Sequence, residues 1–162
     1  MQLEGQITLE DIENEIKAEL NSPQQLDEGA EHAARKPYRI TDFDSPRDKE
    51  MAVFTHAKKL SEYIFVITEK SPKKLRWSII SRLQNASVDV IENLYKANFS
   101  RDDEKRLQYQ RNAMVSLRLL DFYTETARKK QAITIRQTAI IAKQLGETDK
   151  LLNGWIRSTK RK

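Results

Sequence analysis

The sequence predicts an all-α protein: an antiparallel up-down-up-down four-helix bundle with an acidic N-terminal extension. Its 162 residues, of which 38% are hydrophobic, can fill one core, so a single bundle is expected. Four Gly and four Pro are too few for the turns of a β-sandwich or barrel. After residue 45, apolar residues recur at helical spacing in four long stretches with short breaks between them. Short connections make neighbouring helices pack antiparallel.

The acidic extension, residues 1–44, precedes the bundle, residues 45–162. Thr8 and Asp11 have the spacing of a capping box, which predicts that a short amphipathic helix begins there. This helix should be too short to be stable alone. Residues 21–31 are predicted to be a linker, because Pro and Gly interrupt the pattern. The apolar positions of the short helix are Leu9, Ile12, Ile16 and Leu20.

Each helix of the bundle has its own start signal. Ser-Pro stands at residues 45–46 and again at 71–72, which predicts the starts of the first and second helices. The spacing of Ser and Asp at 100–103 predicts the start of the third, and the fourth should run over residues 133–156. Gly146 lies within the fourth helix, where it either permits a close helix approach or marks a break. The residues expected on the buried faces include Met51, Val53, Phe54, Leu60, Ile64, Phe65, Trp77, Ile80, Leu83, Leu94, Leu107, Leu117, Leu120, Ile140, Ile141, Leu152 and Trp155.

Charge divides the chain into two parts of opposite sign. Residues 1–50 contain thirteen acidic and six basic residues, a formal net charge of −7. Residues 51–162 contain eleven acidic and 23 basic residues, a net charge of +12. A domain of that charge attracts polyanions, because each Lys or Arg placed on a phosphate releases condensed counterions. The sign alone leaves RNA, DNA, an anionic membrane and an acidic protein open as partners.

Enzyme chemistry has no support in the sequence. With no Cys there is no disulfide framework, thiolate nucleophile or Cys-based metal site. Val53, not Glu, stands three residues before His56, so the Glu-x-x-His motif of metal bundles is absent, and His56 is expected to be a bundle or interface histidine. We therefore expect no catalytic residues, no metal and no cofactor. The absence of a long apolar run and of a signal peptide predicts a soluble, cytoplasmic protein.

Four cations recur at every seventh position of the predicted fourth helix: Arg136, Lys143, Lys150 and Arg157. Seven steps of 100° return to within about 20° of the start, so these residues form one ridge, which we call the basic ridge, about 32 Å long. The ridge is expected on the outward flank of the buried face, where it could follow a phosphate backbone. The alternative is an ordinary solvated face of a bundle, and both interpretations remain open.

Two further groups of bases are candidate nucleic-acid contacts. Lys73, Lys74 and Arg76 crowd the first turns of the second helix, where positive charge near a helix N-terminus is unfavourable. Their position suggests an anionic ligand. Arg111 and Arg118 on the third helix would line either a subunit interface or a groove.

The remaining bases and the tryptophans have structural explanations. The basic runs at 128–130 and 160–162 lie at helix ends, where cations are favourable. Trp77 and Trp155 fall on apolar faces and are predicted to be core or interface residues, not base-stacking platforms. No RNP-type aromatic motif, zinc finger or basic zipper is visible, so sequence-specific reading of bases is not expected.

Two stretches resemble a known family. Residues 71–98, SPKKLRWSIISRLQNASVDVIENLYKAN, and the ending LLNGWIRS at 151–158 are similar to the four-helix-bundle family of the 23S rRNA intervening-sequence proteins and the accessory variability determinant (Avd) of diversity-generating retroelements. The ending looks closest to the Avd branch, whose pattern is Leu-Leu-Gly-Gly-Trp-Ile-Lys-Ser. Here Asn153 replaces the first Gly and Arg157 the Lys. The resemblance covers about residues 50–158.

The resemblance implies a small, non-catalytic, basic bundle that forms a homopentameric barrel. Such a barrel binds the retroelement's reverse transcriptase and its template RNA and so supports mutagenic retrohoming. Whether this chain prefers RNA or DNA is left open. The alternative is a structural interaction bundle, of the rRNA intervening-sequence type or of another mobile element. Its basic surface would dock an acidic protein in place of nucleic acid, and its own acidic segment is one candidate.

Overall fold

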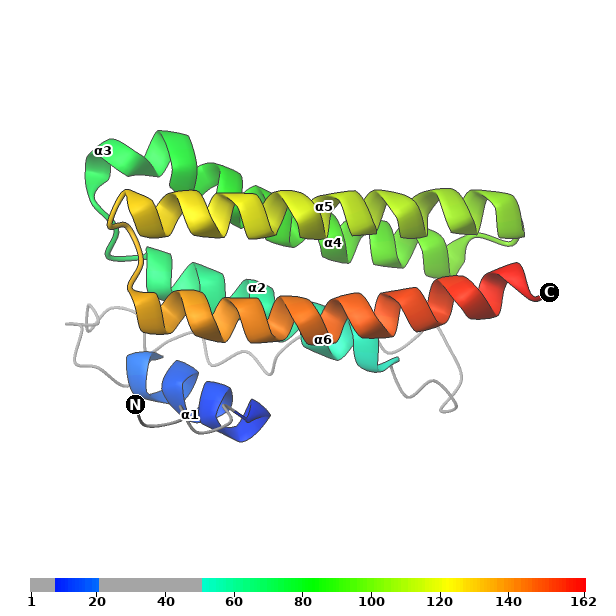
Figure 1. Ribbon diagram of the computed structural model, residues 1–162, viewed down its shortest axis with the longest axis horizontal. Helices are drawn as coiled ribbons and strands as arrows, with labels where there is room; N and C mark the ends of the chain where they lie inside the picture. The colour runs from blue at the N-terminus through cyan, green and yellow to red at the C-terminus, as the bar shows by residue number, and fades with distance from the viewer. Residues whose placement is uncertain (1–7, 21–50) are drawn as a thin grey trace, which may run out of the picture.

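Helices account for almost the whole of the described chain. A computed structural model describes residues 8–20 and 51–162, and these ranges contain no strand, which confirms the predicted all-α class. The predicted linker at 21–31 and the predicted helix start at 45–46 lie outside the described residues. The elements, labelled as in Figure 1, are α1 (Leu9–Leu20), α2 (Ala52–Thr68), α3 (Lys73–Leu75), the π-helix η2 (Arg76–Ile80), α4 (Ser81–Phe99), α5 (Asp103–Lys129) and α6 (Ile135–Lys160).

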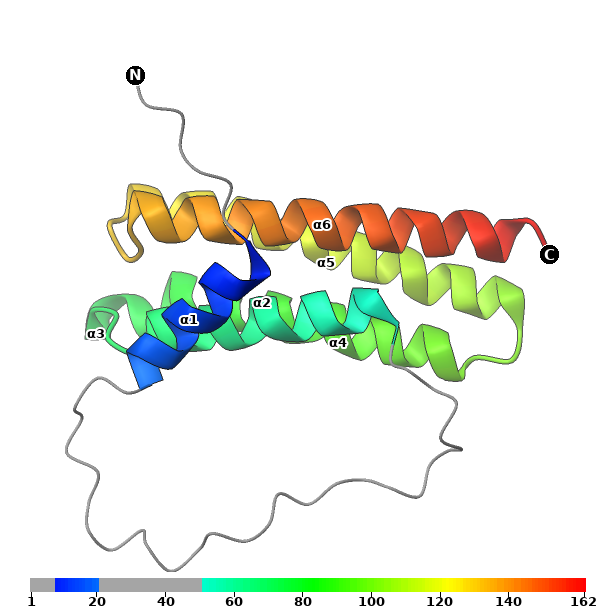
Figure 2. The same cartoon turned by 90° about the horizontal axis from the view of Figure 1, so that it is seen from below.

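The long helices α2, α4, α5 and α6 lie side by side along the long axis of the molecule (Figure 1). Helix α2 contacts α4 and α6, and α5 contacts the same two helices, so the four surround one shared interior. Helix α1 crosses the outside of α2 obliquely (Figure 2). Figure 1 also shows that α3 and the C-terminus lie at opposite ends of the molecule, which we call the α3 end and the C-terminal end.

The interior is filled by apolar side chains from each long helix. Burial of one such side chain contributes about 1.5–3 kcal/mol to folding, which makes the shared interior the main source of stability. The helical spacing of these residues is the one that the sequence predicts. The largest fully buried apolar side chains are Ile12, Leu60, Tyr63, Ile64, Leu83, Leu94, Leu120, Ile140, Ile141 and Leu152.

Hydrogen bonds between polar side chains join neighbouring helices inside this apolar interior. Ser61 of α2 and Ser87 of α4 lie 2.9 Å apart between their hydroxyl oxygens. Gln110 of α5 donates to the hydroxyl of Thr159 of α6 at 3.0 Å. An unpaired buried polar group costs about 1–3 kcal/mol, so these bonds oppose any sliding of one helix along the next.

Two helices begin with a capping box. At α1, Asp11 Oδ2 accepts from the backbone N–H of Thr8 at 2.6 Å, and Thr8 Oγ1 accepts from that of Asp11 at 3.2 Å, as the sequence predicts. At α6, Thr134 and Gln137 form the same reciprocal pair at 3.1 and 2.9 Å. The predicted start at Ile133 is therefore two residues too early, because Ile133 is buried ahead of the cap.

The predicted start of the third helix is wrong by two residues. Ser100 closes the preceding helix, since its hydroxyl donates to the carbonyl of Lys96 at 2.7 Å. Asp102 is the N-cap of α5, and its carboxylate accepts from the backbone N–H of Glu104 at 3.1 Å. A carboxylate at this position also complements the positive end of the helix dipole, which favours Asp over the earlier Ser.

The predicted burial of Trp77 is also wrong, because 93% of its surface is exposed. In a continuous α-helix, Trp77 stands three residues before the buried Ile80 and would share its face. The π-helix η2 adds one residue to this turn and shifts the register. Leu75, five residues before Ile80, packs against the core in consequence, and Trp77 turns outward.

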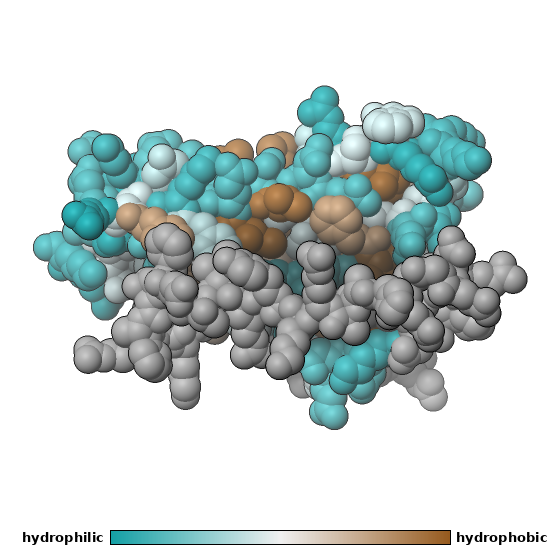
Figure 3. Space-filling view, turned by 180° about the vertical axis from the view of Figure 1, so that it is seen from behind, coloured by the Kyte–Doolittle hydropathy of each residue, from teal (hydrophilic) through white to brown (hydrophobic). Residues whose placement is uncertain are grey.

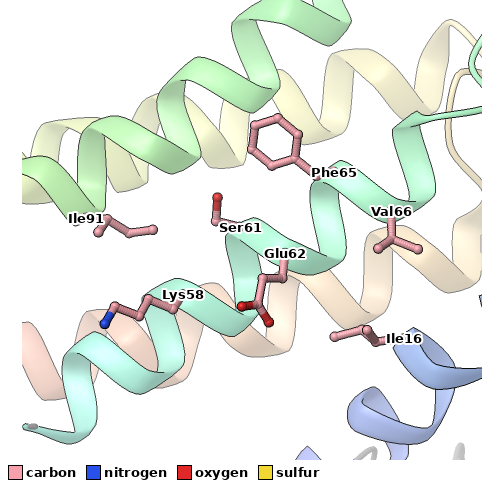
Figure 4. A pocket seen from close by; sticks show the side chains of 7 residues that line it. All are labelled: Ile16, Lys58, Ser61, Glu62, Phe65, Val66 and Ile91. Atoms are coloured by element: carbon pink, nitrogen blue, oxygen red, sulfur yellow. The ribbon is translucent and has the colours of Figure 1, made fainter. Parts of the chain in front are cut away.

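Two other predicted core residues are exposed at the edges of α2. Met51 is 37% exposed because it precedes the helix as its N-cap residue. Phe65 is 45% exposed on the flank of the buried face. It lines a shallow apolar groove of about 430 Å³ together with Ile16 of α1 and Ile91 of α4 (Figure 4). Figure 3 shows apolar side chains gathered in the middle of the face of the molecule opposite to that of Figure 1.

Helix α6 runs unbroken through Gly146, so neither a break nor a close helix approach explains this glycine. The residue is exposed, and a Cβ added there would meet no atom within 4 Å. Replacement of Gly146 by Ala should raise the free energy of unfolding by about 1 kcal/mol, because Ala loses less backbone entropy in a helix. Chemical denaturation monitored by circular dichroism measures this change.

A matched control is Ala142→Gly, at another exposed position of α6, which should lower stability by a similar amount. A Gly146→Ala variant that is less stable than the parent would show that α6 is irregular at this position or that another group packs against Gly146.

Candidate nucleic-acid interface

The structure places the basic ridge on the outer side of α6, as predicted. The opposite side of the helix buries Ile140, Ile141 and Leu152 in the interior. The side chains of Arg136 and Lys150 are 79% and 77% exposed. Arg157 is exposed as well, and Lys143 is half-buried.

Acidic side chains of α1 lie beside the first half of the ridge, although Arg136 itself stays largely exposed. Glu15 of α1 lies 3.8 Å from Nε of Arg136. Hydrogen bonds from Thr8 are the main cause of a lowered pKa at Asp11, and the charges of Lys143 and Arg136 lower it further. We call Arg136 and Lys143 the covered half of the ridge, because acidic side chains already lie beside both.

The second half of the ridge is open. Lys150 has Glu147 of its own helix at 3.8 Å, an exposed pair that contributes little. Arg157 has no ion-pair partner among the described residues. We call Lys150 and Arg157 the open half. An incoming polyanion can reach these two cations without displacing another part of the described chain.

Apolar contacts and two ion pairs, Glu13 with Lys59 and Glu15 with Arg136, hold α1 on the body. Ile12 is fully buried in the core, and Ile16 packs against the core while partly exposed. Glu13 pairs with Lys59 of α2, and the hydrogen bond from Lys59 is the main cause of a lowered pKa at Glu13. The acidic helix is therefore docked by burial and by charge together.

The three bases near the start of the second predicted helix have different roles. Arg76 donates from Nε to the carbonyl of Ser71 at 3.3 Å and from Nη2 to that of Glu69 at 3.5 Å. It therefore satisfies backbone carbonyls at the end of α2, a structural role. Lys73 and Lys74 are exposed and have no ion-pair partner within the described ranges. These two lysines remain candidates for an anionic ligand.

Arg111 and Arg118 are both exposed on α5. Nη2 of Arg118 lies 3.4 Å from Oδ1 of Asp149 on α6, which places Arg118 near the open half of the ridge. Lys73 and Lys74 lie at the α3 end, far from this group, because α3 and the end of α6 are at opposite ends of Figure 1. Lys73 and Lys74 are therefore separate from the open half of the ridge.

Two bases that sequence reasoning assigned to a simple helix end extend the open half. Arg161 and Lys162 line a hollow of about 440 Å³ together with Arg157, Ser158 and Gly154. Arg161 stands four residues after Arg157 and therefore shares its side of the helix. This spacing is visible in the sequence and could have added Arg161 to the predicted ridge.

His56 fills the structural role that the sequence predicts. Its Nδ1 lies 3.3 Å from Oε1 of the buried Gln144, which joins α2 to α6. Among the described residues, no group of three His, Cys, Asp or Glu side chains could hold a metal ion. None of the helices in the described ranges combines the length and apolar character that crossing a bilayer requires.

Together these features define a class: a basic, all-helical protein with a row of cations along its last helix. The model of the bAvd-like family matches residues 51–159, about two-thirds of the chain, and the chain therefore belongs to the bAvd-like family. This family is a non-catalytic accessory family of the Avd type. The match confirms the resemblance found at 71–98 and 151–158 and does not include α1. A comparison with curated proteins finds no match.

The ion pair between Glu13 of α1 and Lys59 of α2 predicts a dependence on pH. Because the pKa of Glu13 is lowered in the docked state, its contribution is complete above the ordinary pKa of 4.5 and is lost as pH falls through the lowered value. Below pH 4.5, amide hydrogen exchange in α1 should therefore accelerate relative to α5, after correction for the intrinsic pH dependence of exchange.

The Lys59→Met variant is the control, since it removes the partner of Glu13 and keeps the apolar stem. Its α1 should exchange faster at neutral pH and respond less to acid. Equal pH dependence in the parent and in Lys59→Met would show that the pair does not hold α1.

Proposed function

We propose that this protein is the non-catalytic accessory subunit of a reverse transcriptase in a diversity-generating retroelement, and that it binds the template RNA. Its body would be an up-down-up-down four-helix bundle that assembles into a homo-oligomer, a pentamer by resemblance. Membership of the bAvd-like family supports the accessory role. The single observation that supports RNA binding best is the open half of the ridge, two exposed cations on a helix whose rotation is fixed by burial.

The geometry of the open half suits a phosphate backbone. A straight helix holds Lys150 and Arg157 about 10 Å apart along its axis, and Arg161 continues the row. Contacts of cations with phosphates position a nucleic acid without reading its sequence. This agrees with the absence of any base-reading motif in the sequence.

The apolar side of α5 supports self-association. Val115, Leu119 and Phe122 are 58%, 43% and 62% exposed. Their spacing of four and three residues places them on one face of the helix. An exposed apolar stripe of this kind is typical of an interface, and Arg111 and Arg118 would lie along its edge. Several copies would bring several open halves to one RNA and increase the overall affinity.

Charge removal along the ridge tests RNA binding. Replacement of Arg136, Lys143, Lys150 and Arg157 together by Gln should weaken binding of an RNA probe and flatten its salt dependence. Removal of each cation that contacts a phosphate should reduce the log–log salt slope by about 1. The open pair, Lys150→Gln with Arg157→Gln, should account for more of the decrease in affinity than the covered pair. Fluorescence anisotropy at several salt concentrations measures both quantities.

Arg82→Gln with Lys96→Gln provides the control, because it removes two exposed charges of α4, which contacts α2 and α5 and lies across the bundle from α6. Unchanged binding in a folded four-residue variant would remove the ridge from the proposal.

A second candidate function is a structural bundle whose basic surface docks an acidic protein. The observation that favours it is α1 itself, an acidic helix that lies against Arg136 and Lys143. In this alternative, nucleic acid has no role. Deletion of residues 1–44 tests whether the acidic segment masks the basic surface. If it does, the shortened protein should bind polyanions more strongly. If the segment is only an independent tether, polyanion binding should not change.

A point variant releases α1 within the full chain. Ile12→Asp places a charge at a fully buried position and should detach α1, which exposes the covered half of the ridge. We expect the affinity for an RNA probe to rise several-fold at low salt. Asn14→Asp is the matched control, since it adds the same charge at an exposed position of α1. Weaker or equal RNA binding by Ile12→Asp would show that α1 does not compete with RNA.

A further inference from the structure

Trp77 is the most exposed large apolar side chain among the described residues, at 93%. Tryptophan is usually well buried, because folding removes roughly 150–250 Å² of its surface from water. The second tryptophan follows this rule: Trp155 is partly buried and its ring centroid lies 6.2 Å from that of Phe54. The exposure of Trp77 therefore needs an explanation.

Local backbone structure causes this exposure. The π-helix η2 brings Leu75, Ile79 and Ile80 to the interior and leaves Trp77 outside. π-Helical turns are rare and recur at functional sites. The ring therefore projects from a well-anchored turn, with its faces accessible to solvent.

Two exposed cations stand close to Trp77 in the chain at the α3 end. Lys73 and Lys74 lie four and three residues before Trp77, within about one turn, and both are exposed. A hollow of about 690 Å³ at the same end of the molecule is lined by Lys70 and Pro72 from one connection and by Lys129 from another. Figure 1 shows these two connections, α2–α3 and α5–α6, at the same end of the molecule.

The acidic side chains at this end do not cancel the positive charge. Glu125 is paired with Arg128, whose Nε lies 3.1 Å from it. Glu69 is exposed and forms no ion pair with Lys73 or Lys74, and neither lysine has another ion-pair partner in the described part of the chain. The α3 end thus combines an exposed aromatic face with uncompensated cations.

We propose that the α3 end is a second nucleic-acid contact, at which Trp77 stacks on an unpaired base and Lys73 and Lys74 contact the adjacent phosphates. The inference rests on the proposed function and specifies the form of its ligand, a single strand. Cations alone would accept a duplex equally well. An aromatic face adds a preference for single strands, because only unpaired bases can leave their neighbours and stack on a side chain.

The same composition disfavours a protein as the ligand of Trp77. Tryptophan is a common anchor in protein–protein interfaces, but lysine is depleted there. Two unpaired lysines next to the ring would be desolvated by a protein partner, at a cost in binding free energy. A nucleotide strand gives both features a partner, since it carries a base face beside each phosphate.

Tryptophan fluorescence tests the stacking directly. The full-length Trp155→Phe variant leaves Trp77 as the only tryptophan. Its emission should be that of a water-exposed ring and should be quenched when an oligouridylate of about 12 nucleotides binds. An abasic oligomer of the same length, which has the phosphates without the bases, should bind and leave the emission unchanged. A duplex RNA should also leave it unchanged.

Affinity gives an independent measurement. Trp77→Ala should weaken oligouridylate binding about tenfold, and Trp77→Phe should retain most of the affinity because it keeps an aromatic face. Because the side chain is exposed, both variants should fold, and circular dichroism verifies this. Lys73→Gln with Lys74→Gln should lower the log–log salt slope by about 1 to 2 and leave the quenching at saturation intact.

Several results would overturn the inference. If the parent binds oligouridylate without quenching, and Trp77→Ala binds equally well while the ridge variant does not, this site is wrong and the proposed function stands. If the parent binds no RNA at all, both are wrong. An emission typical of a buried ring in the free protein would show that another copy covers Trp77. A spectral change only with a protein partner would identify Trp77 as a protein anchor.

Discussion

The burial of one side of α6 is the constraint on which the arrangement of charge depends. Ile140, Ile141 and Leu152 pack into the shared interior and fix the rotation of the helix about its axis. Cations placed at every seventh residue must then project outward along the whole helix, since each step drifts by only about 20°. The packing that stabilises the fold is therefore also the packing that aligns the basic ridge. If the core packed less tightly, α6 could rotate and its four cations would no longer hold fixed positions.

Helical periodicity predicted the all-α class, and the spacing of Thr8 and Asp11 predicted the start of α1, because both depend on neighbours in sequence. The exposure of Trp77 was not predicted from helical periodicity, since one rare π-helical turn changes the face of every residue before it relative to those after it. The position of α1 on the covered half of the ridge is likewise a long-range contact. Composition indicated only that opposite charges were present.

The acidic helix makes the two halves of the ridge unequal. A polyanion that contacts Arg136 or Lys143 would compete with carboxylates of α1, whereas Lys150 has only Glu147 of its own helix beside it and Arg157 has no ion-pair partner among the described residues. Tethering gives α1 a high local concentration, so under the proposed function it would compete effectively even though each of its exposed ion pairs is weak. Binding would then begin at the C-terminal end and reach the covered half only when the ligand is long or strongly charged.

The two hydrogen bonds from Arg76 to the carbonyls of Ser71 and Glu69 have a consequence for the neighbouring tryptophan. They tie the beginning of η2 to the end of α2, so the turn that carries Trp77 has little freedom to reorient. A ring held in this way loses little conformational entropy when a planar group settles on it. Arg76 would thus hold the turn in one conformation and pre-organise the Trp77 ring for binding, without contacting a ligand itself.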